Sequence, residues 1–264
     1  MGSAAFNVTD LFSLDGRVAV VTGGAGQVGG EIARGLAACG AKVAIFDIVA
    51  APESDGVQSF AVDVTDRAAI ERATAELSEV PHILVNAAAL DSPPDAPVEE
   101  VGPFEDYPAD SFDDVMQVNV KGTLLACQVI GARMADEGRG SIVNVSSIYG
   151  MLSPVQELYD FRRAGGETFF KPIAYSVSKS ALYNLTRYLA TYWAKNGVRV
   201  NTLTLAGVWN GQPAEFVDAY TARMPLGRMA DAKEVIGPAV FLASDASSYV
   251  TGANVVVDGG WSAW

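Results

Sequence analysis

Apolar and polar positions alternate in blocks along almost the whole chain. Seven apolar runs fit strands: Arg17–Thr22, Lys42–Asp47, Ser59–Val64, Ile83–Ala88, Ser141–Ser146, Arg199–Thr204 and Asn254–Val257. Most of them are continuously apolar, as expected for strands that are buried on both faces. Between them lie stretches with helical spacing, at Val28–Ala38, Arg67–Leu77, Phe112–Asp136, Ala174–Lys195 and Lys233–Ser244. This alternation predicts an α/β protein, a Rossmann-like doubly wound parallel sheet of about seven strands with helices on both faces.

No internal repeat or linker divides the chain, so residues 1–264 are predicted to form a single domain. Three segments interrupt the alternation, at residues 91–110, 148–172 and 208–225. Long loops in compact domains are often functional, and ligands of open α/β sheets bind beyond the carboxyl ends of the strands. We therefore expect these three segments to shape the pocket for a substrate.

Charge and composition narrow the range of partners. The chain carries 31 acidic and 18 basic side chains, for a net charge of -13, and such a surface repels phosphate backbones. Nucleic acid is therefore not an expected partner. The segment Met1–Asp15 lacks the basic and apolar parts of a signal peptide, and no apolar stretch approaches the ~20 residues that cross a bilayer. We expect a cytoplasmic protein with no membrane association.

The cysteines and the single histidine offer little for catalysis. Cys39 and Cys127 lie in apolar helical contexts without CxxC spacing, which is typical of thiols in the core. His82 follows a proline just before an apolar run, and no acidic residue nearby could orient it for a catalytic triad. Neither a disulfide framework nor a metal site is predicted.

The first predicted strand leads into a G-x-G-x-x-G motif at residues 24–29, which opens a helix. Glycines there permit a tight turn, and the free amides at the helix start can hold a pyrophosphate. Asp47 ends the second predicted strand, where a carboxylate can accept hydrogen bonds from both ribose hydroxyls. Because Ile48 follows and the motif contains no Lys or Arg, nothing would neutralise a 2′-phosphate. NAD is therefore expected rather than NADP, with capping of a turn as the alternative role for Asp47.

A tyrosine and a lysine lie one helical turn apart, at Tyr175 and Lys179. A nearby ammonium favours phenolate over phenol, and about 4 kcal/mol of differential interaction would move a tyrosine pKa from about 10 toward neutrality. Such a phenol could act as a general acid or base. The pair alone is a weak signal, because this spacing is common in helices.

Several motifs occur in a fixed order together with this pair. They are Thr22-Gly23 before the glycine motif, Asn86-Ala87-Ala88, Asn119-Val120-Lys121-Gly122, Ser146-Ser147, Tyr175-Ser-Val-Ser-Lys179, Val198-Arg199-Val200-Asn201 and Val257-Asp258-Gly259-Gly260. Over essentially its whole length the chain resembles the short-chain dehydrogenase/reductase family. The resemblance implies transfer of a hydride between a nicotinamide cofactor and a secondary alcohol or ketone.

The resemblance also implies roles for four residues. Tyr175 would exchange the proton, and Lys179 would bind the nicotinamide ribose and lower the pKa of Tyr175. Ser147 would hold the substrate oxygen, with Ser146 as the alternative. Asn119 would position a water in a proton relay, and its alternative role is to kink its helix. As charge grows on the carbonyl oxygen, Tyr175 and Ser147 can supply hydrogen bonds to it.

For the cofactor, the resemblance and the motifs together indicate a larger set of contacts. The set is Gly23, Gly26, Gln27, Val28, Asp47, Ile48, Asp63, Val64, Asn86, Ala87, Ala88, Tyr175, Lys179, Val208 and Asn210. Asp63 would meet the adenine edge or else cap the following helix. The chain departs from the family pattern where Ala87 to Ala89 follow Asn86, and where Leu205-Ala206 replaces the usual Pro-Gly.

The stretch between Ser147 and Tyr175 is roughly twice as long as is usual in the family, so it must fold away and return. It resembles an insert found in members that act on bacterial surface sugars. Arg162, Arg163 and Lys171 within it are candidates for binding a substrate carboxylate or phosphate. Tyr149, Trp209 and Phe216 are expected to line the substrate pocket.

The apolar end of the chain contains Trp261 and Trp264, and we expect it to be buried against a neighbouring subunit of a homotetramer or homodimer, as is usual in the family. The predicted substrate is a polar alcohol or carbonyl compound, such as a sugar, a polyol or a sugar acid. Two alternatives are a sugar epimerase or dehydratase that keeps NAD bound, indicated by the spacing of Gly23, Gly26 and Gly29, and a non-catalytic module that senses NAD.

Overall fold

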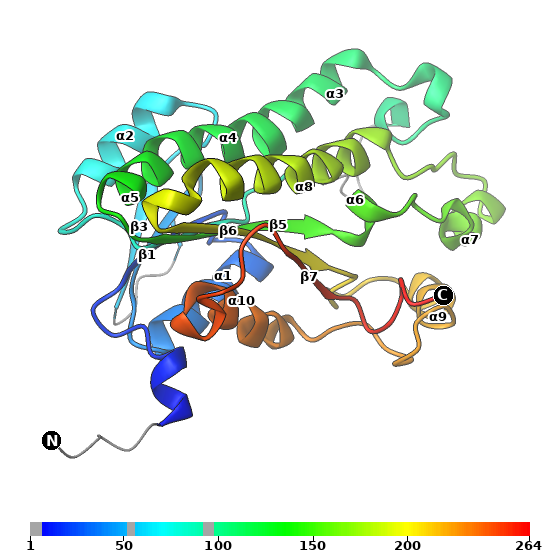
Figure 1. The fold of residues 1–264 in the computed structure, drawn as a ribbon. Coiled ribbons are helices and arrows are strands. Elements are labelled where there is room, and N and C mark those ends of the chain that lie inside the picture. The colour runs from blue at the N-terminus through cyan, green and yellow to red at the C-terminus, as the bar shows by residue number, and fades with distance from the viewer. Residues whose placement is uncertain (1–6, 52–55, 92–97) are drawn as a thin grey trace, which may run out of the picture.

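Seven strands form one sheet in the computed structural model, which describes residues 7–51, 56–91 and 98–264 (Figure 1). They are β1 (Val18–Thr22), β2 (Lys42–Asp47), β3 (Val57–Ala61), β4 (Ile83–Asn86), β5 (Gly140–Ser147), β6 (Val198–Leu205) and β7 (Asn254–Val257). The order across the sheet is β3-β2-β1-β4-β5-β6-β7, and every neighbouring pair is parallel. This confirms the predicted fold class. The strand order reverses between β1 and β4, the point where ligands bind in sheets of this type.

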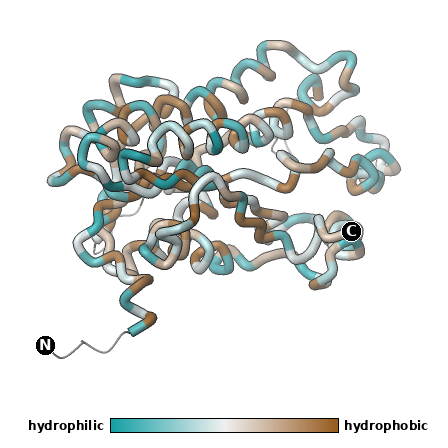
Figure 2. Tube along the Cα trace, viewed as in Figure 1, coloured by the Kyte–Doolittle hydropathy of each residue, from teal (hydrophilic) through white to brown (hydrophobic). Residues whose placement is uncertain are grey.

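Helices cover both faces of the sheet, because successive strand residues point to opposite sides. Ala19 and Val21 pack against α1 (Gln27–Ala38) and α10 (Ile236–Ala243), whereas Val20 lies in the core on the other side. That second face is covered by α2 (Arg67–Ala75), α4 (Thr123–Ala126), α5 (Ala132–Asp136) and α8 (Ile173–Trp193). Figure 2 shows hydrophobic positions along the strands and hydrophilic ones on the outer helix surfaces.

The long helix predicted at Phe112–Asp136 is continuous but not regular. It consists of α3 (Ala109–Met116), a π-helical segment at Gln117–Gly122, α4, a second π-helical segment at Cys127–Gly131, and α5. A π turn holds more residues than an α turn and often marks a functional site. Hydrophobic spacing cannot reveal such a turn, since the apolar face continues through it.

The third strand lies earlier in the chain than predicted, at β3 rather than Ser59–Val64. The Oδ1 atom of Asp63 accepts hydrogen bonds from the backbone nitrogen of Thr65 at 2.8 Å and from its hydroxyl at 2.7 Å. This local turn lies beyond the end of the strand. Val62 and Val64 remain buried outside it, which is why the apolar pattern extended the prediction too far.

Short helices beyond the carboxyl ends of the strands occupy the segments predicted as loops. They are α6 (Ile148–Met151), a 3₁₀ turn at Gln156–Tyr159, α7 (Asp160–Ala164) and α9 (Ala214–Thr221). Further 3₁₀ turns are Val8–Phe12, Val98–Glu100, Phe104–Asp106, Ala194–Asn196, Ala232–Val235 and Asp245–Ser247. Residues 92–97 of the predicted loop 91–110 lie outside the described part of the chain. Figure 1 shows α6, α7 and α9 grouped beyond the carboxyl ends of the strands.

A third apolar cluster holds this outer layer together. It contains Ile148, Tyr149, Leu158, Tyr220, Met224, Met229 and Trp261. The ring of Trp261 stacks on that of Tyr220 with 4.5 Å between centroids, and only 6% of the residue is exposed. The expected burial against another subunit is therefore wrong for Trp261, which packs within its own chain. Trp264 is 83% exposed, and its burial in an assembly stays a prediction.

The histidine and the cysteines have structural surroundings. His82 precedes β4 at the amino edge of the sheet, and its Nδ1 accepts a hydrogen bond from the backbone nitrogen of Val18 at 3.0 Å. Burial lowers the pKa of His82 and raises that of Cys127 to about 12. Both cysteines are free thiols. In the described residues, no helix has the length and apolarity needed to span a membrane.

Candidate active site

Tyr175 and Lys179 lie in the first turns of α8, which begins directly after Pro172. Lys179 is 4% exposed, and its Nζ donates a hydrogen bond to the carbonyl oxygen of Val145 at 3.0 Å. The same Nζ lies 5.7 Å from the centre of the Tyr175 ring. The buried ammonium is held in one place. The two side chains lie next to each other, as their spacing of one helical turn predicted.

Ser147 ends β5, and its side chain lies close enough to the phenol of Tyr175 to lower the pKa of that phenol. The Oγ of Ser147 also accepts from the backbone nitrogen of Tyr149 at 3.2 Å, which caps the start of α6. Ser146 points elsewhere, since its Oγ donates to the carbonyl oxygen of Lys179 at 2.9 Å. The structure therefore places Ser147, rather than Ser146, beside the phenol.

The long segment after Ser147 folds away and returns, as expected, because α6 packs closely on α8. A Cβ atom added to Gly150 would lie 2.8 Å from the carbonyl carbon of Lys179 and 2.9 Å from the ring of Tyr183. Tyr183 donates its hydroxyl to the carbonyl oxygen of Ser147 at 3.1 Å and contacts the hydroxyl of Thr204 at 2.8 Å. Sequence reasoning missed Tyr183, although it lies one turn beyond Lys179 on the same helix face.

Asn119 is fully buried within the first π-helical segment. Its Oδ1 accepts from the backbone nitrogen of Leu90 at 2.7 Å, and its Nδ2 donates to the carbonyl oxygen of Leu90 at 2.9 Å. The Nδ2 also donates to the hydroxyl of Ser178 at 2.9 Å. Asn119 thus joins its helix to the chain after β4 and to α8, in addition to lying where the helix is irregular.

The pKa of Tyr175 shifts in the direction opposite to that expected. Burial raises it, the Asp91 carboxylate raises it further, and the hydrogen bond with Ser147 lowers it. Burial also lowers the pKa of Lys179 to about 8. The protein side chains alone therefore do not produce an acidic phenol, because desolvation disfavours phenolate and ammonium alike.

The turn between β1 and α1 matches the geometry that a pyrophosphate requires. Gly23 has a φ of 67°, and a Cβ atom there would lie 2.6 Å from the Cα of Ala88, so only glycine fits. No side chain caps the start of α1 at Gly26. Uncapped amides at the start of a helix can donate hydrogen bonds to an anion such as a pyrophosphate. Thr22 Oγ1 accepts from the backbone nitrogens of Ala87 at 3.2 Å and Ala88 at 3.3 Å, tying β1 to β4.

Asp47 lies at the end of β2, next to this turn. Its Oδ2 accepts from the backbone nitrogen of Ala25 at 3.0 Å, and its Oδ1 from that of Val49 at 3.1 Å. Ile48 is 74% exposed. The helix amides and this carboxylate fit a dinucleotide, with Asp47 at the ribose and the α1 amides at the pyrophosphate.

The remaining predicted cofactor residues lie in varied surroundings. Asp63 is exposed and is engaged in the turn to Thr65, and Val64 is buried against Gly122. Asn86 is buried at the end of β4, where its Nδ2 donates to the Oδ1 of Asn144 at 2.9 Å.

The chain after β6 borders the glycine turn. The Nε2 of Gln27 donates to the carbonyl oxygen of Trp209 at 2.7 Å, and Val208 forms a bridge with Ala230. Asn210 is exposed, and its backbone nitrogen donates to Gln212 Oε1 at 2.7 Å. The Gln27 contact joins the cofactor turn to the chain that carries the expected substrate residues.

Tyr175 packs against the third apolar cluster, which is rich in aromatic residues and contains the expected substrate residue Tyr149. Tyr149 is buried in the third cluster, whereas Trp209 is 51% exposed. The ring of Phe216 lies 5.5 Å from those of Tyr159 and Tyr220. The hydroxyl of Tyr220 accepts a hydrogen bond from the backbone nitrogen of Gly207 at 2.7 Å, which anchors α9 to the end of β6. Sequence reasoning missed Tyr159 and Tyr220.

The basic residues of the insert form ion pairs. Arg162 pairs with Glu167 at 2.6 Å, and Arg163 pairs with Asp160. The guanidinium of Arg162 also lies 4.1 Å from the centre of the Phe169 ring. Both arginines therefore stabilise the insert itself, and Lys171, which pairs with Asp91, is the basic residue of the insert that reaches Tyr175.

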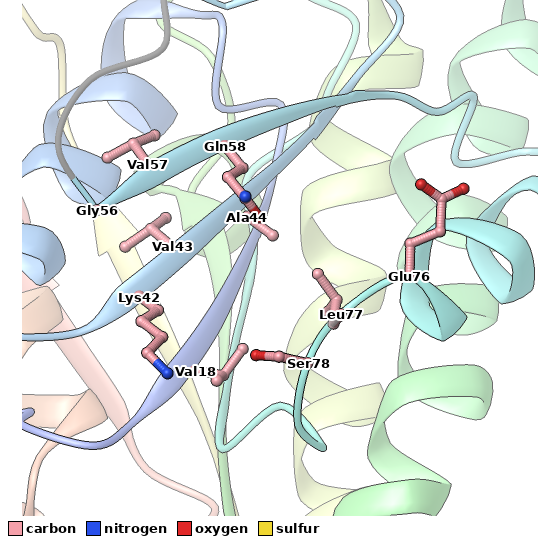
Figure 3. A pocket seen from close by; sticks show the side chains of 10 residues that line it. All are labelled: Val18, Lys42, Val43, Ala44, Gly56, Val57, Gln58, Glu76, Leu77 and Ser78. Carbon is pink, nitrogen blue, oxygen red and sulfur yellow. The ribbon is translucent and has the colours of Figure 1, made fainter.

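A cavity of about 710 Å³ lies near the amino ends of β1, β2 and β3 (Figure 3). Val18, Lys42, Val43 and Gln58 line it, together with Glu76 and Leu77 after α2. These are residues near the amino ends of the strands, and none of the predicted catalytic residues is among them. In the described part of the chain, no group of three or more His, Cys, Asp or Glu side chains is arranged to hold a metal ion.

The open parallel sheet, the glycine turn and the Ser147–Tyr175–Lys179 group define a nicotinamide-dependent oxidoreductase. Residues 23–262 match a protein family described as enoyl-(acyl carrier protein) reductase. The chain belongs to the short-chain dehydrogenase/reductase family, as the sequence motifs predicted.

Two relatives with known activities align over nearly their full lengths. D-threitol dehydrogenase from Mycolicibacterium smegmatis is 33% identical, with 95% of each chain covered. Galactitol 2-dehydrogenase (L-tagatose-forming) from Cereibacter sphaeroides is 34% identical, with 96% of this chain and 98% of the relative covered.

Two solved structures share the fold. A short-chain dehydrogenase from Leptospira borgpetersenii with bound NAD+ has a TM-score of 0.84 at 30% identity, covering 99% of this chain and 98% of the other. A gluconate 5-dehydrogenase from Burkholderia cenocepacia in complex with NADP and tartrate has a TM-score of 0.82 at 27% identity, covering 98% of this chain and all of the other. Together these proteins establish that the chain is an enzyme that interconverts a secondary alcohol and a ketone with a nicotinamide cofactor.

Proposed function

We propose that this enzyme is an NAD-dependent dehydrogenase that oxidises a secondary hydroxyl of a polyol or a sugar acid to a ketone. The observation that carries the proposal is the buried Lys179 ammonium, held at the carbonyl oxygen of Val145 and 5.7 Å from the centre of the Tyr175 ring, with Ser147 at the end of β5. The named relatives that act on threitol, galactitol and gluconate support the substrate class.

In this proposal, the glycine turn and Asp47 would hold a nicotinamide dinucleotide, which would supply the acceptor for the hydride of the substrate carbon. Ser147 holds the substrate oxygen, and Tyr175 accepts its proton as the carbonyl forms. Lys179 holds the nicotinamide ribose and provides positive charge near the phenol. Asn119 positions the water through which the proton leaves toward Lys179. Because burial raises the pKa of Tyr175, phenolate needs positive charge nearby, which Lys179 provides and to which an oxidised nicotinamide would add.

The preference for NAD over NADP rests on Asp47 and on the residues after it. A 2′-phosphate would place negative charge against the Asp47 carboxylate, and the neighbouring Ile48 offers no cation to offset it. The solved relatives include one with NAD+ and one with NADP, so the carboxylate is the feature that supports the proposed preference for NAD.

We retain the homotetramer, or a homodimer, as the proposed assembly, and the cytoplasm as the proposed location. The exposed Trp264 and the stacked, exposed rings of Tyr188 and Tyr192 on α8 support a contact between subunits. Sedimentation at micromolar concentration would measure the assembly, and a monomer would contradict it.

A spectrophotometric screen tests the proposed function. Purified enzyme is incubated with NAD or NADP and with polyols, sugar acids or simple secondary alcohols, and the absorbance of reduced cofactor is followed. We expect continuous production of free NADH with at least one polyhydroxylated alcohol. Turnover of sugars without release of NADH would instead support an epimerase with tightly bound NAD. No turnover of any secondary alcohol with either cofactor would contradict the proposal.

A further inference from the structure

A second buried lysine lies next to Tyr175. Lys171 is 8% exposed, and its Nζ lies 5.1 Å from the centre of the Tyr175 ring, compared with 5.7 Å for Lys179. Lys171 precedes the tyrosine by as many residues as Lys179 follows it. Burying a lysine is unfavourable unless its charge has a partner, so the position of this ammonium needs a reason.

The backbone of Lys171 is held in place by one side chain. Its nitrogen donates to the Oε1 of Gln156 at 2.8 Å, and its carbonyl oxygen accepts from the Nε2 of Gln156 at 3.1 Å. Pro172 follows and restricts the conformation of Lys171 to the extended region. The insert thus anchors the start of this side chain before it reaches the site.

The charge partner of Lys171 is Asp91, which belongs to a different segment. The two form an ion pair, and the Asp91 side chain is 54% exposed. Asp91 follows Leu90, whose backbone is held by the amide of Asn119. Burial raises the pKa of Tyr175 and lowers that of Lys179, and the Asp91 carboxylate adds to the first shift and opposes the second.

The pair offers a substrate both kinds of hydrogen bond without net charge. An ammonium has three donors, so bonding to Asp91 leaves others for a substrate oxygen, and a carboxylate can accept from more than one hydroxyl. The other cations of the insert, Arg162 and Arg163, already face Glu167 and Asp160. A substrate carboxylate would therefore meet a cation that is already neutralised and an acidic group beside it.

We propose that the Lys171–Asp91 ion pair binds a hydroxyl next to the reacting carbon and makes the enzyme selective for neutral polyols over sugar acids. This inference rests on the proposed function, because it narrows the substrate of the same site. Charge-assisted hydrogen bonds to this pair favour a hydroxyl neighbour, and the Asp91 charge disfavours a carboxylate.

The first test removes the negative charge alone. D-threitol and D-threonate have the same number of carbons and differ in whether one end is a carboxylate. In the wild type, we expect kcat/KM for threitol to exceed that for threonate by at least about tenfold. In Asp91→Asn, the Lys171 ammonium loses its anionic partner, and we expect the ratio to move toward threonate by about tenfold or more.

The second test removes the ammonium. Lys171→Met retains most of the side-chain length, and we expect kcat/KM for threitol to fall by about ten- to hundredfold relative to that for 2-butanol, mainly through KM. 2-Butanol has no second hydroxyl that could bind Lys171. The ratio of kcat/KM for threitol to kcat/KM for 2-butanol therefore separates a loss of substrate binding from a general loss of activity. Lys42→Met is the matched control, because Lys42 pairs with Glu79 at 3.1 Å on the far edge of the sheet. Its ratio should equal that of the wild type.

The outcomes separate this inference from the proposed function. If the wild type oxidises no secondary alcohol, the proposed function fails. If it oxidises polyols but neither variant changes a ratio, or if the wild type prefers threonate, the inference is wrong and the proposed function stands. If Lys171→Met does not fold by circular dichroism, the shift toward threonate in Asp91→Asn decides the matter.

Discussion

The two sides of Tyr175, one facing the glycine turn and one facing the third apolar cluster, are formed by different parts of the protein. On the proposed cofactor side, backbone amides and short connections near β1, β2 and β4 form the turn, and Asp47 is its main charged group. On the proposed substrate side, aromatic rings and an ion pair from distant segments meet beyond the carboxyl ends of the strands. The difference indicates that the cofactor side depends on the shape of the main chain, whereas the substrate side depends on the identity of individual side chains.

Tyr175 lies at the boundary, and its loss should have the largest effect. Tyr175→Phe removes the proton acceptor but retains the ring that packs next to both lysines. We expect kcat/KM to fall by about three orders of magnitude, in the range for general acid–base catalysis. Steady-state kinetics measures the loss, and NAD titration by protein fluorescence should show unchanged affinity. A variant with near wild-type turnover would contradict the proposed proton transfer.

Asp47→Ala tests the cofactor side. Loss of the ribose hydrogen bonds should raise KM for NAD by about ten- to hundredfold, since bonds to a charged group are worth ~1.5–3 kcal/mol. KM for NADP should change less or fall, because the repulsion of the 2′-phosphate disappears. The ratio of kcat/KM for the two cofactors at saturating polyol is the measurement. An unchanged ratio would exclude Asp47 as the selector and leave it as a cap of the glycine turn.

Lys179→Met should lower the activity of the enzyme and raise its stability at pH 7. Burial lowers the pKa of Lys179 from 10.5 to about 8, so the folded state holds this proton less tightly than the unfolded state does. The buried charge of Lys179 destabilises the wild type to its full extent below pH 8. This effect disappears as the pH rises to about 10.5. We expect the free energy of unfolding of the variant to exceed that of the wild type by ~1–3 kcal/mol at pH 7. This difference should shrink above pH 8. Urea unfolding at pH 7 and pH 10 measures both.

A variant less stable than the wild type at pH 7 would contradict this balance. It would mean that the hydrogen bond from Lys179 to Val145 outweighs the unfavourable burial of the charge.

Tyr220→Phe tests the substrate side with the smallest change. It removes the hydroxyl that accepts from the backbone nitrogen of Gly207, while the ring stacking with Trp261 remains. We expect a loss of about 1 kcal/mol in the free energy of unfolding, together with a higher KM for the alcohol and an unchanged KM for NAD. A matching rise in both KM values would show that the two sides are not separable.

Much of the fold and of the cofactor side could be predicted from the sequence, because both follow local rules. Buried parallel strands are continuously apolar, and a glycine turn followed by an acidic strand end leaves a recognisable spacing. Where the prediction of β3 failed, Val62 and Val64 were buried for reasons other than strand pairing.

The substrate side could not be predicted in the same way. The contact of Lys171 with Asp91 joins residues far apart in the chain, and nothing in either local sequence indicates the other. The raised pKa of Tyr175 also depends on burial, which the spacing of Tyr175 and Lys179 does not reveal. In both cases the sequence identified individual residues. It did not reveal the three-dimensional surroundings that determine the charge partner of Lys171 and the pKa of Tyr175.

Trp261 is almost the last residue of the chain, yet its ring is part of the cluster next to the substrate site, and Figure 1 shows this end of the chain beside α9. Synthesis proceeds from the amino end, so the nucleotide-binding half emerges from the ribosome well before this tryptophan does. The aromatic cluster can therefore be completed only after residue 261 has emerged, later than the dinucleotide turn. A chain truncated by premature termination before Trp261 would retain the dinucleotide turn while lacking the aromatic wall for its alcohol.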